Sequence, residues 1–165
     1  MKAYRILTVL LAIISVSGCS APPPTEQLTK GPCEPLTSVV VIDGDTIKTS
    51  ERKIRFIGIN TMELTTTNKT QKKWALIAKE ELTHIIEQAP VCIVKDPQVA
   101  DKDKYGRDLR YVYQGNTLLN ESLVEKGLAE VYMIDTFTYK EGFLKKQAAA
   151  VEQGTGMWKD RKPRK

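Results

Sequence analysis

Runs of β-branched residues separated by polar turns shape the first part of this 165-residue chain. Residues 37–42 and 46–49 are two such runs, and Asp43 and Gly44 join them as a hairpin-type turn pair. Residues 53–59 alternate between apolar and polar positions in the way that a half-buried strand does. Together these positions predict a meander of three strands.

Helical spacing replaces this pattern after a polar stretch. Apolar residues recur every three or four positions from about Lys73 to Gln88, and Pro90 ends the segment. Five strands and three helices, in this order, predict an α+β fold with a mainly β core, arranged as a small closed OB-type barrel with attached helices. The other predicted helices and strands cover residues 120–126, 138–153, 91–94 and 109–113.

The N-terminal residues differ in pattern from the rest of the chain. Lys2 and Arg5 precede an apolar run at residues 6–16, which is too short to span a bilayer. Small residues and Cys19 follow, and this order resembles the cleavage box of bacterial lipoproteins. The resemblance implies removal of residues 1–18 and export, with a lipid on Cys19 that anchors the protein to a bacterial membrane, facing the periplasm or the exterior. An ordinary signal peptide with an unrelated cysteine is the alternative.

Composition divides the mature chain into three parts. Residues 19–35 hold most of the early prolines and predict an extended, lipidated tether. Residues 36–158 form the predicted folded domain, and residues 159–165 are a basic tail. The sequence contains no sign of oligomerisation, so we expect a monomer.

Cys33 and Cys92 are the two cysteines that are left if Cys19 carries lipid. In an oxidising compartment two cysteines are a natural pair, and their spacing fits no metal motif. We expect a disulfide between them, with two half-buried thiols as the alternative.

The charge of the chain is mildly basic. Its 25 Lys and Arg residues against 20 Asp and Glu give a net charge of +5, which falls to +3 without Lys2 and Arg5. Lys69, Lys72 and Lys73 form one basic cluster and the tail forms another. Such clusters favour a polyanionic partner, and a solvated lysine face is the alternative explanation.

Several residues in two short motifs have chemistry that the fold does not require. Asp43 and Asp45 offer carboxylate oxygens at a tight corner, and Ca²⁺ and Mg²⁺ prefer such ligands, although many hairpin turns have this pattern without a metal. Arg55 is predicted to share a strand face with apolar residues, which is unusual for a solvated charge. Glu63 follows the strand that contains Arg55, and the second motif, residues 103–107, ends in Arg107. Together these groups predict a metal-assisted phosphodiesterase site.

Four stretches in register resemble the staphylococcal nuclease (thermonuclease) family. They are residues 41–48, 54–63, 103–107 and 120–129, and the likeness covers nearly the whole domain. The resemblance implies a five-stranded OB-type barrel with three helices. It also implies a Ca²⁺-dependent nuclease that hydrolyses DNA and RNA with little sequence preference and leaves 3′-phosphate ends.

The resemblance further implies a cation site. Asp45 is the expected direct Ca²⁺ ligand, and Asp43 would support the site from a second layer. Thr61 would contribute its backbone carbonyl. Asn60 stands where the family usually has a second carboxylate ligand. Because calcium affinity follows the number of charged ligands, we expect weaker Ca²⁺ binding or a changed metal preference.

The remaining implied roles concern catalysis and substrate binding. Glu63 is expected to activate the attacking water, and Arg55 and Arg107 to hold the reacting phosphate. Lys104 and Tyr105 stand where the family contacts nucleotide phosphates.

Two further positions depart from the family's pattern. Met62 replaces the usual proline before the glutamate, which we expect to loosen the turn that directs Glu63. Tyr132 lies one position from the residue that commonly stacks on a nucleotide base, so that role is not assigned here.

Two other functions fit parts of the sequence. A non-catalytic OB-type lipoprotein could bind single-stranded nucleic acid through a basic surface, and a surface lipoprotein could be purely structural or adhesive. Family relatives that only bind tend to lose the catalytic acid and arginines. Because Arg55, Glu63 and Arg107 are all present, we expect an enzyme.

Overall fold

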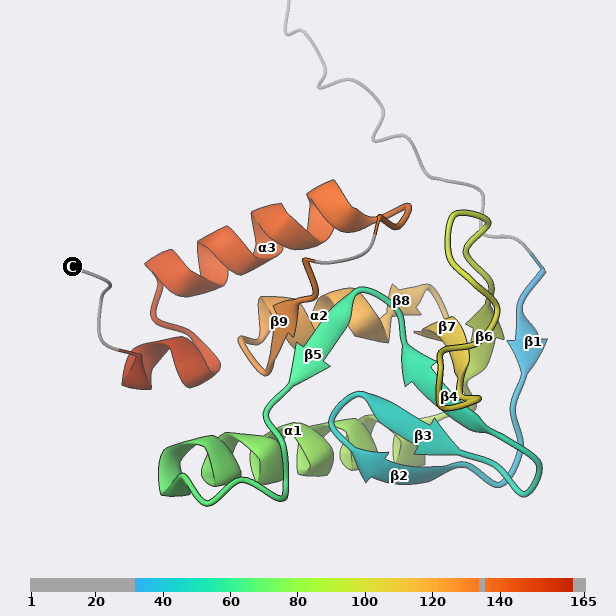
Figure 1. Ribbon diagram of the computed structural model, residues 1–165, viewed down its shortest axis with the longest axis horizontal. Helices are drawn as coiled ribbons and strands as arrows, with labels where there is room; N and C mark the ends of the chain where they lie inside the picture. The colour runs from blue at the N-terminus through green and yellow to red at the C-terminus, as the bar shows by residue number, and fades with distance from the viewer. Residues whose placement is uncertain (1–31, 134–135, 162–165) are drawn as a thin grey trace, which may run out of the picture.

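The computed structural model describes residues 32–133 and 136–161, with helix α1 along one side of the molecule and helix α3 along the other (Figure 1). The strands are β1 (Glu34–Pro35), β2 (Val40–Asp43), β3 (Thr46–Lys48), β4 (Lys53–Phe56), β5 (Ile59–Thr61), β6 (Cys92–Val94), β7 (Asp108–Gln114), β8 (Thr117–Leu118) and β9 (Ala129–Val131). The helices are α1 (Lys69–Gln88), α2 (Leu119–Glu125), α3 (Lys140–Glu152) and the 3-10 helix η1 (Gly156–Asp160).

Several sequence predictions concern residues outside this description. The predicted signal peptide, Cys19, most of the tether and residues 162–165 lie outside the described residues. In the part of the chain that is described, no helix is both long enough and apolar enough to span a membrane.

One mixed sheet contains most of the strands. Its order is β1, β6, β7, β4, β3, β2, with β8 added to β7, and β4 and β7 run parallel. β5 pairs with β9 in a separate two-stranded sheet. The α+β prediction is therefore confirmed, and the arrangement is consistent with an OB-like fold. The structure differs from the expected closed barrel, because the described strands pair as an open sheet with β1 and β2 at its edges.

Gly58 explains why the predicted strand over residues 53–59 is divided. The sequence predicts one strand over residues 53–59, but the chain turns at Ile57 and Gly58 and divides it into β4 and β5. Gly58 has a φ of +76°, and a Cβ there would lie 2.5 Å from the ring of Phe137. Only glycine tolerates both conditions. β5 therefore leaves the large sheet and pairs with β9.

Asn68 sets the start of α1 four residues before the predicted one. Its side-chain oxygen accepts hydrogen bonds from the amides of Thr70 and Gln71 at 3.0 and 3.1 Å. These bonds satisfy two amides that the first turn of a helix leaves without partners. Residues 69–72, at the end of the polar stretch before Lys73, therefore belong to the helix. The end of α1 at Gln88 agrees with the prediction.

The apolar face of α1 packs against β2 and positions the turn after it. The buried residues of the helix are Trp74, Ala75, Ala78 and Leu82. Gly44 in the turn approaches so closely that a Cβ there would lie 2.7 Å from the Cβ of Ala78. A larger side chain at this position would push the corner with Asp43 and Asp45 away from the helix.

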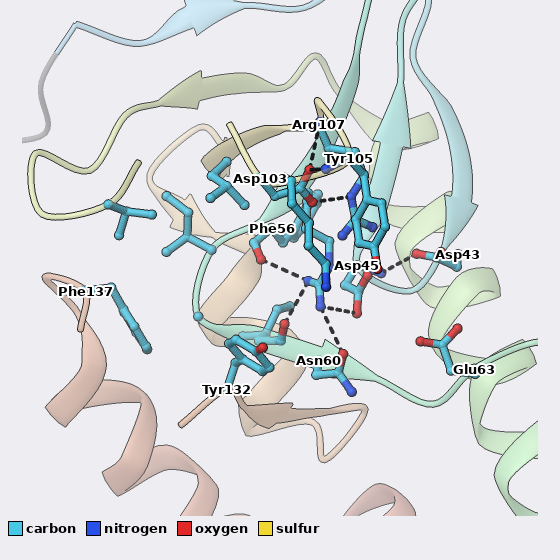
Figure 2. A pocket seen from close by; sticks show the side chains of 17 residues that line it. Asp43, Asp45, Phe56, Asn60, Glu63, Asp103, Tyr105, Arg107, Tyr132 and Phe137 are labelled. Carbon is cyan, nitrogen blue, oxygen red and sulfur yellow. Dashed lines mark hydrogen bonds and ion pairs between the residues drawn. The ribbon is translucent and has the colours of Figure 1, made fainter. Parts of the chain in front are cut away.

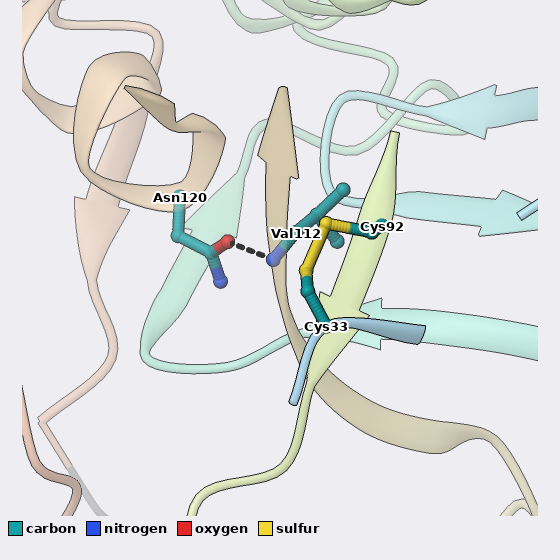
Figure 3. Close-up of a disulfide and its surroundings, with 4 residues drawn as sticks. All are labelled: Cys33, Cys92, Val112 and Asn120. Atoms are coloured by element: carbon teal, nitrogen blue, oxygen red, sulfur yellow. Dashed lines mark hydrogen bonds between the residues drawn. A yellow bond between two sulfur atoms is a disulfide. The ribbon is translucent and has the colours of Figure 1, made fainter. Parts of the chain in front are cut away.

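A disulfide joins Cys33, just before β1, to Cys92 in β6 (Figure 3). It is the pair that the sequence favours over two thiols. Because β1 has only two residues and pairs with β6, the covalent bridge is a major attachment of this edge strand.

A buried asparagine joins α2 to the sheet. Asn120 is fully buried, and its oxygen accepts a hydrogen bond from the amide of Val112 at 2.9 Å (Figure 3). Its nitrogen donates to the carbonyl of Ile57 at 2.9 Å. Both ends of the amide are thus satisfied, as a buried polar group requires. The turn between β4 and β5 is thereby held from α2, and this turn forms part of the site.

Candidate active site

A cavity of about 500 Å³ lies where the β2–β3 corner, strands β4 and β5 and the loop before β7 meet (Figure 2). It gathers residues that are far apart in the sequence. Of the residues that the sequence assigns to the site, those lining the cavity are Asp43, Asp45, Arg55, Asn60, Glu63, Lys104, Tyr105 and Arg107.

Thr61, which the sequence also assigns to the site, is not among the residues that line the cavity but supports Asp45. Its amide and its hydroxyl donate to Oδ2 of Asp45 at 2.7 and 3.0 Å, and the hydroxyl of Thr46 donates to Oδ1 at 3.0 Å. Asp45 in turn donates its amide to Oδ1 of Asp43 at 3.1 Å. The structure therefore gives Thr61 a clear role as a hydrogen-bond donor that orients the carboxylate of Asp45.

The two acids of this corner influence each other. Burial, together with the negative charge of Asp45, raises the pKa of the Asp43 carboxyl above its ordinary value. Nearby positive charge would favour the ionised form of Asp43. The corner therefore has the electrostatic character of a cation site.

Arg55 is held at the wall of the cavity by two backbone carbonyls. Nη1 donates to the carbonyl oxygens of Phe56 and Ile59 at 3.0 and 2.8 Å. Nη2 donates to Oδ1 of Asn60 at 3.0 Å and lies 3.3 Å from Oδ2 of Asp45 (Figure 2). These partners explain how an arginine occupies an otherwise apolar strand, because its buried donors are hydrogen-bonded.

Arg107 is positioned by Asp103, four residues before it. Oδ2 of Asp103 accepts from Nε of Arg107 at 2.6 Å, and Oδ1 accepts from the amides of Tyr105 and Arg107 at 2.9 and 3.0 Å. Gly106 closes this turn with a φ of +77°. Among the described residues, Asp103 engages Nε, and neither terminal nitrogen of Arg107 has a hydrogen-bond or ion-pair partner.

Tyr105 stands at the mouth of the cavity with 72% of its surface exposed. Nζ of Lys104 lies 5.1 Å and Cζ of Arg107 lies 5.5 Å from the centre of its ring. These contacts are within the range of cation–π attraction. They group two cations and one aromatic ring at the entrance.

Glu63 lies on the side of the cavity that carries Asp43 and Asn60 (Figure 2). It follows the end of β5 and is exposed. Within the described residues its carboxylate has no hydrogen-bond or ion-pair partner. The group is therefore available to accept a proton from a water molecule in the cavity.

A comparison with known protein families identifies the family of this chain. The model of staphylococcal nuclease homologues matches residues 53–160, which is most of the folded domain. The chain belongs to the staphylococcal nuclease family. The match includes Arg55, Asn60, Glu63 and Arg107 and begins after the corner with Asp43 and Asp45.

Individual relatives support the assignment of this chain to the staphylococcal nuclease family. A thermonuclease of Staphylococcus hyicus is 30% identical, and the match covers 72% of each chain. An uncharacterized endonuclease of Haemophilus influenzae is 27% identical over 96% of this chain and 80% of its own. An uncharacterized protein of Methanocaldococcus jannaschii is 33% identical over 73% of this chain and 69% of its own. The protein is accordingly a hydrolase of the nuclease class.

The donors around Asp45 fit a hard cation with few charged ligands. Asp43, Asp45 and Asn60 contribute oxygen atoms, which Ca²⁺ and Mg²⁺ prefer. Among the described residues, no three acidic, histidine or cysteine side chains converge as a metal group. Nη2 of Arg55 already contacts both Asp45 and Asn60, so a cation would compete with this guanidinium for the same oxygens.

The sequence assigns no role to three residues of this cavity. Asp103 belongs to the 103–107 stretch, and an Asp two residues before an exposed turn residue commonly accepts from the turn amides. Tyr132 and Phe137 also line the cavity and give it an aromatic wall opposite the acids. No local signal identifies Phe137, because its place depends on contact with Gly58.

Proposed function

We propose that this protein is a divalent-metal-dependent nuclease, with Ca²⁺ as its preferred ion, that hydrolyses both DNA and RNA with little sequence preference. The observation that carries the proposal is the meeting of Arg55 and Arg107, from separate elements, in one cavity with Asp45 and Glu63. A base, two arginines and a cation corner are the groups that phosphodiester hydrolysis requires.

The two arginines are suited to bind the reacting phosphate. A guanidinium stays charged at all working pH values and matches phosphate oxygens with paired donors. Arg55 is anchored by two backbone carbonyls and Arg107 by Asp103. Because both are held in place before substrate arrives, they can stabilise the charge that develops as water attacks phosphorus.

Glu63 is suited to remove a proton from the attacking water. As the new oxygen–phosphorus bond forms, the bond from phosphorus to the 5′ oxygen breaks. The leaving oxygen takes up a proton from solvent water, and Glu63 later returns its proton to solvent. The products are a 3′-phosphate and a 5′-hydroxyl, as the family resemblance implies. General-base catalysis of this kind contributes about 10²- to 10⁴-fold.

Asp43, Asp45, Asn60 and the carbonyl of Thr61 would hold the cation. A bound divalent ion supplies Lewis-acid polarisation of a phosphoryl oxygen and favours ionisation of a nearby water. Lys104 and Tyr105 are placed at the entrance, where they would contact the phosphates next to the scissile one.

Glu63→Gln is the decisive test of this function. Activity on single- and double-stranded DNA and RNA would be measured with Ca²⁺ and with a chelator. We expect Glu63→Gln to reduce kcat by at least about 100-fold, and Glu51→Gln, an exposed acid-to-amide change in the β3–β4 turn, to match the wild type. Hydrolysis that persists in chelator, or full activity of Glu63→Gln, would contradict the proposal.

The alternative is a binding module without catalysis. It is favoured only if the wild type binds single strands with a strong salt dependence and hydrolyses no substrate with any divalent ion. The Glu63 carboxylate, which has no partner among the described residues, argues against it, since a binding surface for phosphates gains nothing from an acid in its lining.

We also propose that the protein is exported and held on a bacterial membrane by lipid on Cys19, as a monomer. The leader pattern supports this, with Lys2, Arg5, an apolar run and a small-residue box before Cys19. Metabolic labelling with a fatty acid tests it. The label should appear in the wild type and vanish in Cys19→Ser, and a labelled Cys19→Ser protein would refute the assignment.

A further inference from the structure

A second hollow of about 240 Å³ lies beside the catalytic cavity, between the start of α1 and η1. Met62, Trp74 and Arg161 are among the residues that line it. Met62 directly precedes Glu63, which lines the catalytic cavity. The two hollows are therefore neighbours along the chain segment that follows β5.

Basic residues surround this second hollow. Nζ of Lys73 lies 5.0 Å and Nζ of Lys159 lies 4.9 Å from the centre of the Trp74 ring. The fold thus places two lysines from distant parts of the sequence, one in α1 and one in η1, over one ring. We call this region the α1–η1 surface, and its exposed basic residues are Lys69, Lys72, Lys73, Lys159 and Arg161.

The rigidity of this surface comes from Trp74. Trp74 is 5% exposed, so it acts as a fixed wall and not as a stacking platform. Its Nε1 donates to Oδ2 of Asp160 at 2.9 Å, and Nζ of Lys73 lies 3.7 Å from the same oxygen. These contacts hold η1 against α1, and with it the two lysines.

Arg161 connects the α1–η1 surface to the catalytic side of the molecule. It forms an ion pair with Glu130 in β9, and Glu130 is the cross-strand partner of Asn60 in β5. Asn60 lines the catalytic cavity. The surface therefore begins next to the β5–β9 ladder on which the candidate cation site is built.

We propose that the α1–η1 surface binds the nucleic-acid strand where it leaves the catalytic cavity past Glu63 and Met62. This inference rests on the proposed nuclease function. Phosphates of the strand would meet Lys73 and Lys159, and the polar side chains of Thr70 and Gln71 would face its sugars and bases. The protein thus engages substrate over more nucleotides than the scissile site alone requires.

An anionic membrane is the other polyanion that a basic surface can meet. The described chain enters the domain at β1, whereas the start of α1 and η1 lie at the opposite side of the molecule (Figure 1). A lipid anchor on Cys19 would act through the β1 end. The continuity with the catalytic cavity and the distance from β1 both favour a nucleic-acid strand.

The test compares two charge-removing double variants of the full mature chain. Lys73→Gln with Lys159→Gln changes the α1–η1 surface. Lys48→Gln with Lys53→Gln is the matched control, because these exposed lysines are cross-strand partners in the β3–β4 hairpin. Binding of a fluorescent 30-nucleotide single strand is measured by anisotropy in chelator, and hydrolysis is measured separately with Ca²⁺.

We expect the Lys73/Lys159 variant to bind the 30-mer about tenfold more weakly at 0.1 M salt, with a salt slope smaller by about 1.4. Its kcat/KM on the 30-mer should fall relative to that on a trinucleotide. The control should keep both values. If the first variant folds poorly, a second one replaces it: Lys69→Gln with Lys72→Gln, on the same surface but away from Trp74. It should also weaken binding of the 30-mer.

Equal losses in the control, or unchanged binding in the surface variants, would overturn the inference. Loss of binding only to phosphatidylglycerol vesicles would identify a membrane contact and overturn it as well. If the binding difference is found but no variant hydrolyses any substrate, the surface stands and the proposed catalysis fails. If the proteins hydrolyse substrate but their binding does not differ, the proposed catalysis stands and the proposed role of the surface fails.

Discussion

Arg55 and a bound cation would use the same two oxygen atoms. Nη2 of Arg55 contacts Oδ1 of Asn60 and Oδ2 of Asp45. With a carboxylate at position 60, a doubly charged ion would gain more from the added negative charge than a singly charged guanidinium does. Asn60 lacks this negative charge and so reduces the advantage of the doubly charged ion. It therefore favours Arg55 over a cation as the partner of these two oxygen atoms.

Asn60→Asp should therefore raise the affinity for Ca²⁺. We expect the variant to bind Ca²⁺ about tenfold more tightly, which corresponds to about 1.4 kcal/mol, because one charged ligand is added. The measurement is the Ca²⁺ dependence of hydrolysis, together with the rise in Tm that Ca²⁺ produces. Asn116→Asp, an exposed change in the β7–β8 turn, adds the same charge elsewhere. Equal responses in both variants would show that position 60 does not contact the cation.

Asp103 should act on catalysis through Arg107. The bond from Nε of Arg107 to Asp103 is 2.6 Å long, and a hydrogen bond between charged groups contributes about 1.5–3 kcal/mol. We expect Asp103→Ala to lower kcat/KM by about 10- to 100-fold, and to add little to the loss that Arg107→Ala causes.

A double-mutant cycle measures this coupling. Asp101→Ala is the control, because it removes another acid of the same loop that does not contact Arg107. If the losses of Asp103→Ala and Arg107→Ala simply add, Asp103 does not work by positioning the arginine.

The sequence motifs predicted most residues of the site. The chemistry of the site uses residue types that rarely have another role at such positions. Arg55 on an apolar strand is an example, since its burial requires acceptors that the structure supplies in Phe56 and Ile59. The supporting contacts were harder to predict. The donation from Thr61 to Asp45 and the wall formed by Phe137 depend on approaches between segments that no local pattern records.

At the scale of elements, the differences from the prediction have tertiary causes. Residues 69–72 are polar and resemble a loop, yet the cap from Asn68 makes them helical. Residues 53–59 alternate like one strand, yet the packing of Phe137 against Gly58 divides them. Periodicity describes which face of an element is buried, but it does not show where a distant side chain interrupts that element.

Asp96 joins the loop before β7 to the start of α3. Its carboxylate accepts from the hydroxyl of Tyr111 at 2.5 Å, from the amide and hydroxyl of Thr138 at 2.7 and 2.8 Å, and from the amide of Gln98 at 2.8 Å. Burial alone would raise the pKa of Asp96, but these bonds outweigh it and lower the pKa. Thr138 follows Phe137, so the network also supports the aromatic wall of the cavity.

Asp96→Asn should destabilise the protein in a pH-dependent way. Since folding lowers the pKa of Asp96, its contribution is complete above the unfolded value of about 3.9 and is lost as the pH falls through the folded value. We expect the variant to be less stable by about 3 kcal/mol at pH 7, with the difference shrinking below about pH 4. Urea unfolding from pH 7 to pH 3 measures it.

Glu51→Gln provides the comparison for this series, because Glu51 is exposed and its side chain has no hydrogen-bond or ion-pair partner among the described residues. Its stability should follow the wild type at every pH. A loss in Asp96→Asn that stays constant down to pH 3 would mean that the carboxylate charge is not what stabilises the loop.

At the scale of the whole molecule, the two ends of the described chain have different attachments. The C-terminal end is held through η1, where Asp160 accepts from Trp74 and Arg161 pairs with Glu130. The N-terminal end is held by a two-residue strand and the bridge between Cys33 and Cys92. If lipid on Cys19 anchors the protein, any pull on the tether acts first on this bridge.

Removal of the disulfide should therefore lower global stability without destroying the site. The cysteines are 59 residues apart in the sequence, and closing a loop of this length stabilises the fold by about 4 kcal/mol in the chain-entropy description. We expect Cys33→Ser with Cys92→Ser to lose about this free energy of unfolding in urea. Because neither cysteine lines the catalytic cavity, kcat at 25 °C should change less than about twofold. Adding reductant should destabilise the wild type by the same amount and leave the double variant unchanged. If neither reductant nor the double substitution lowers the free energy of unfolding, the bridge contributes no stability.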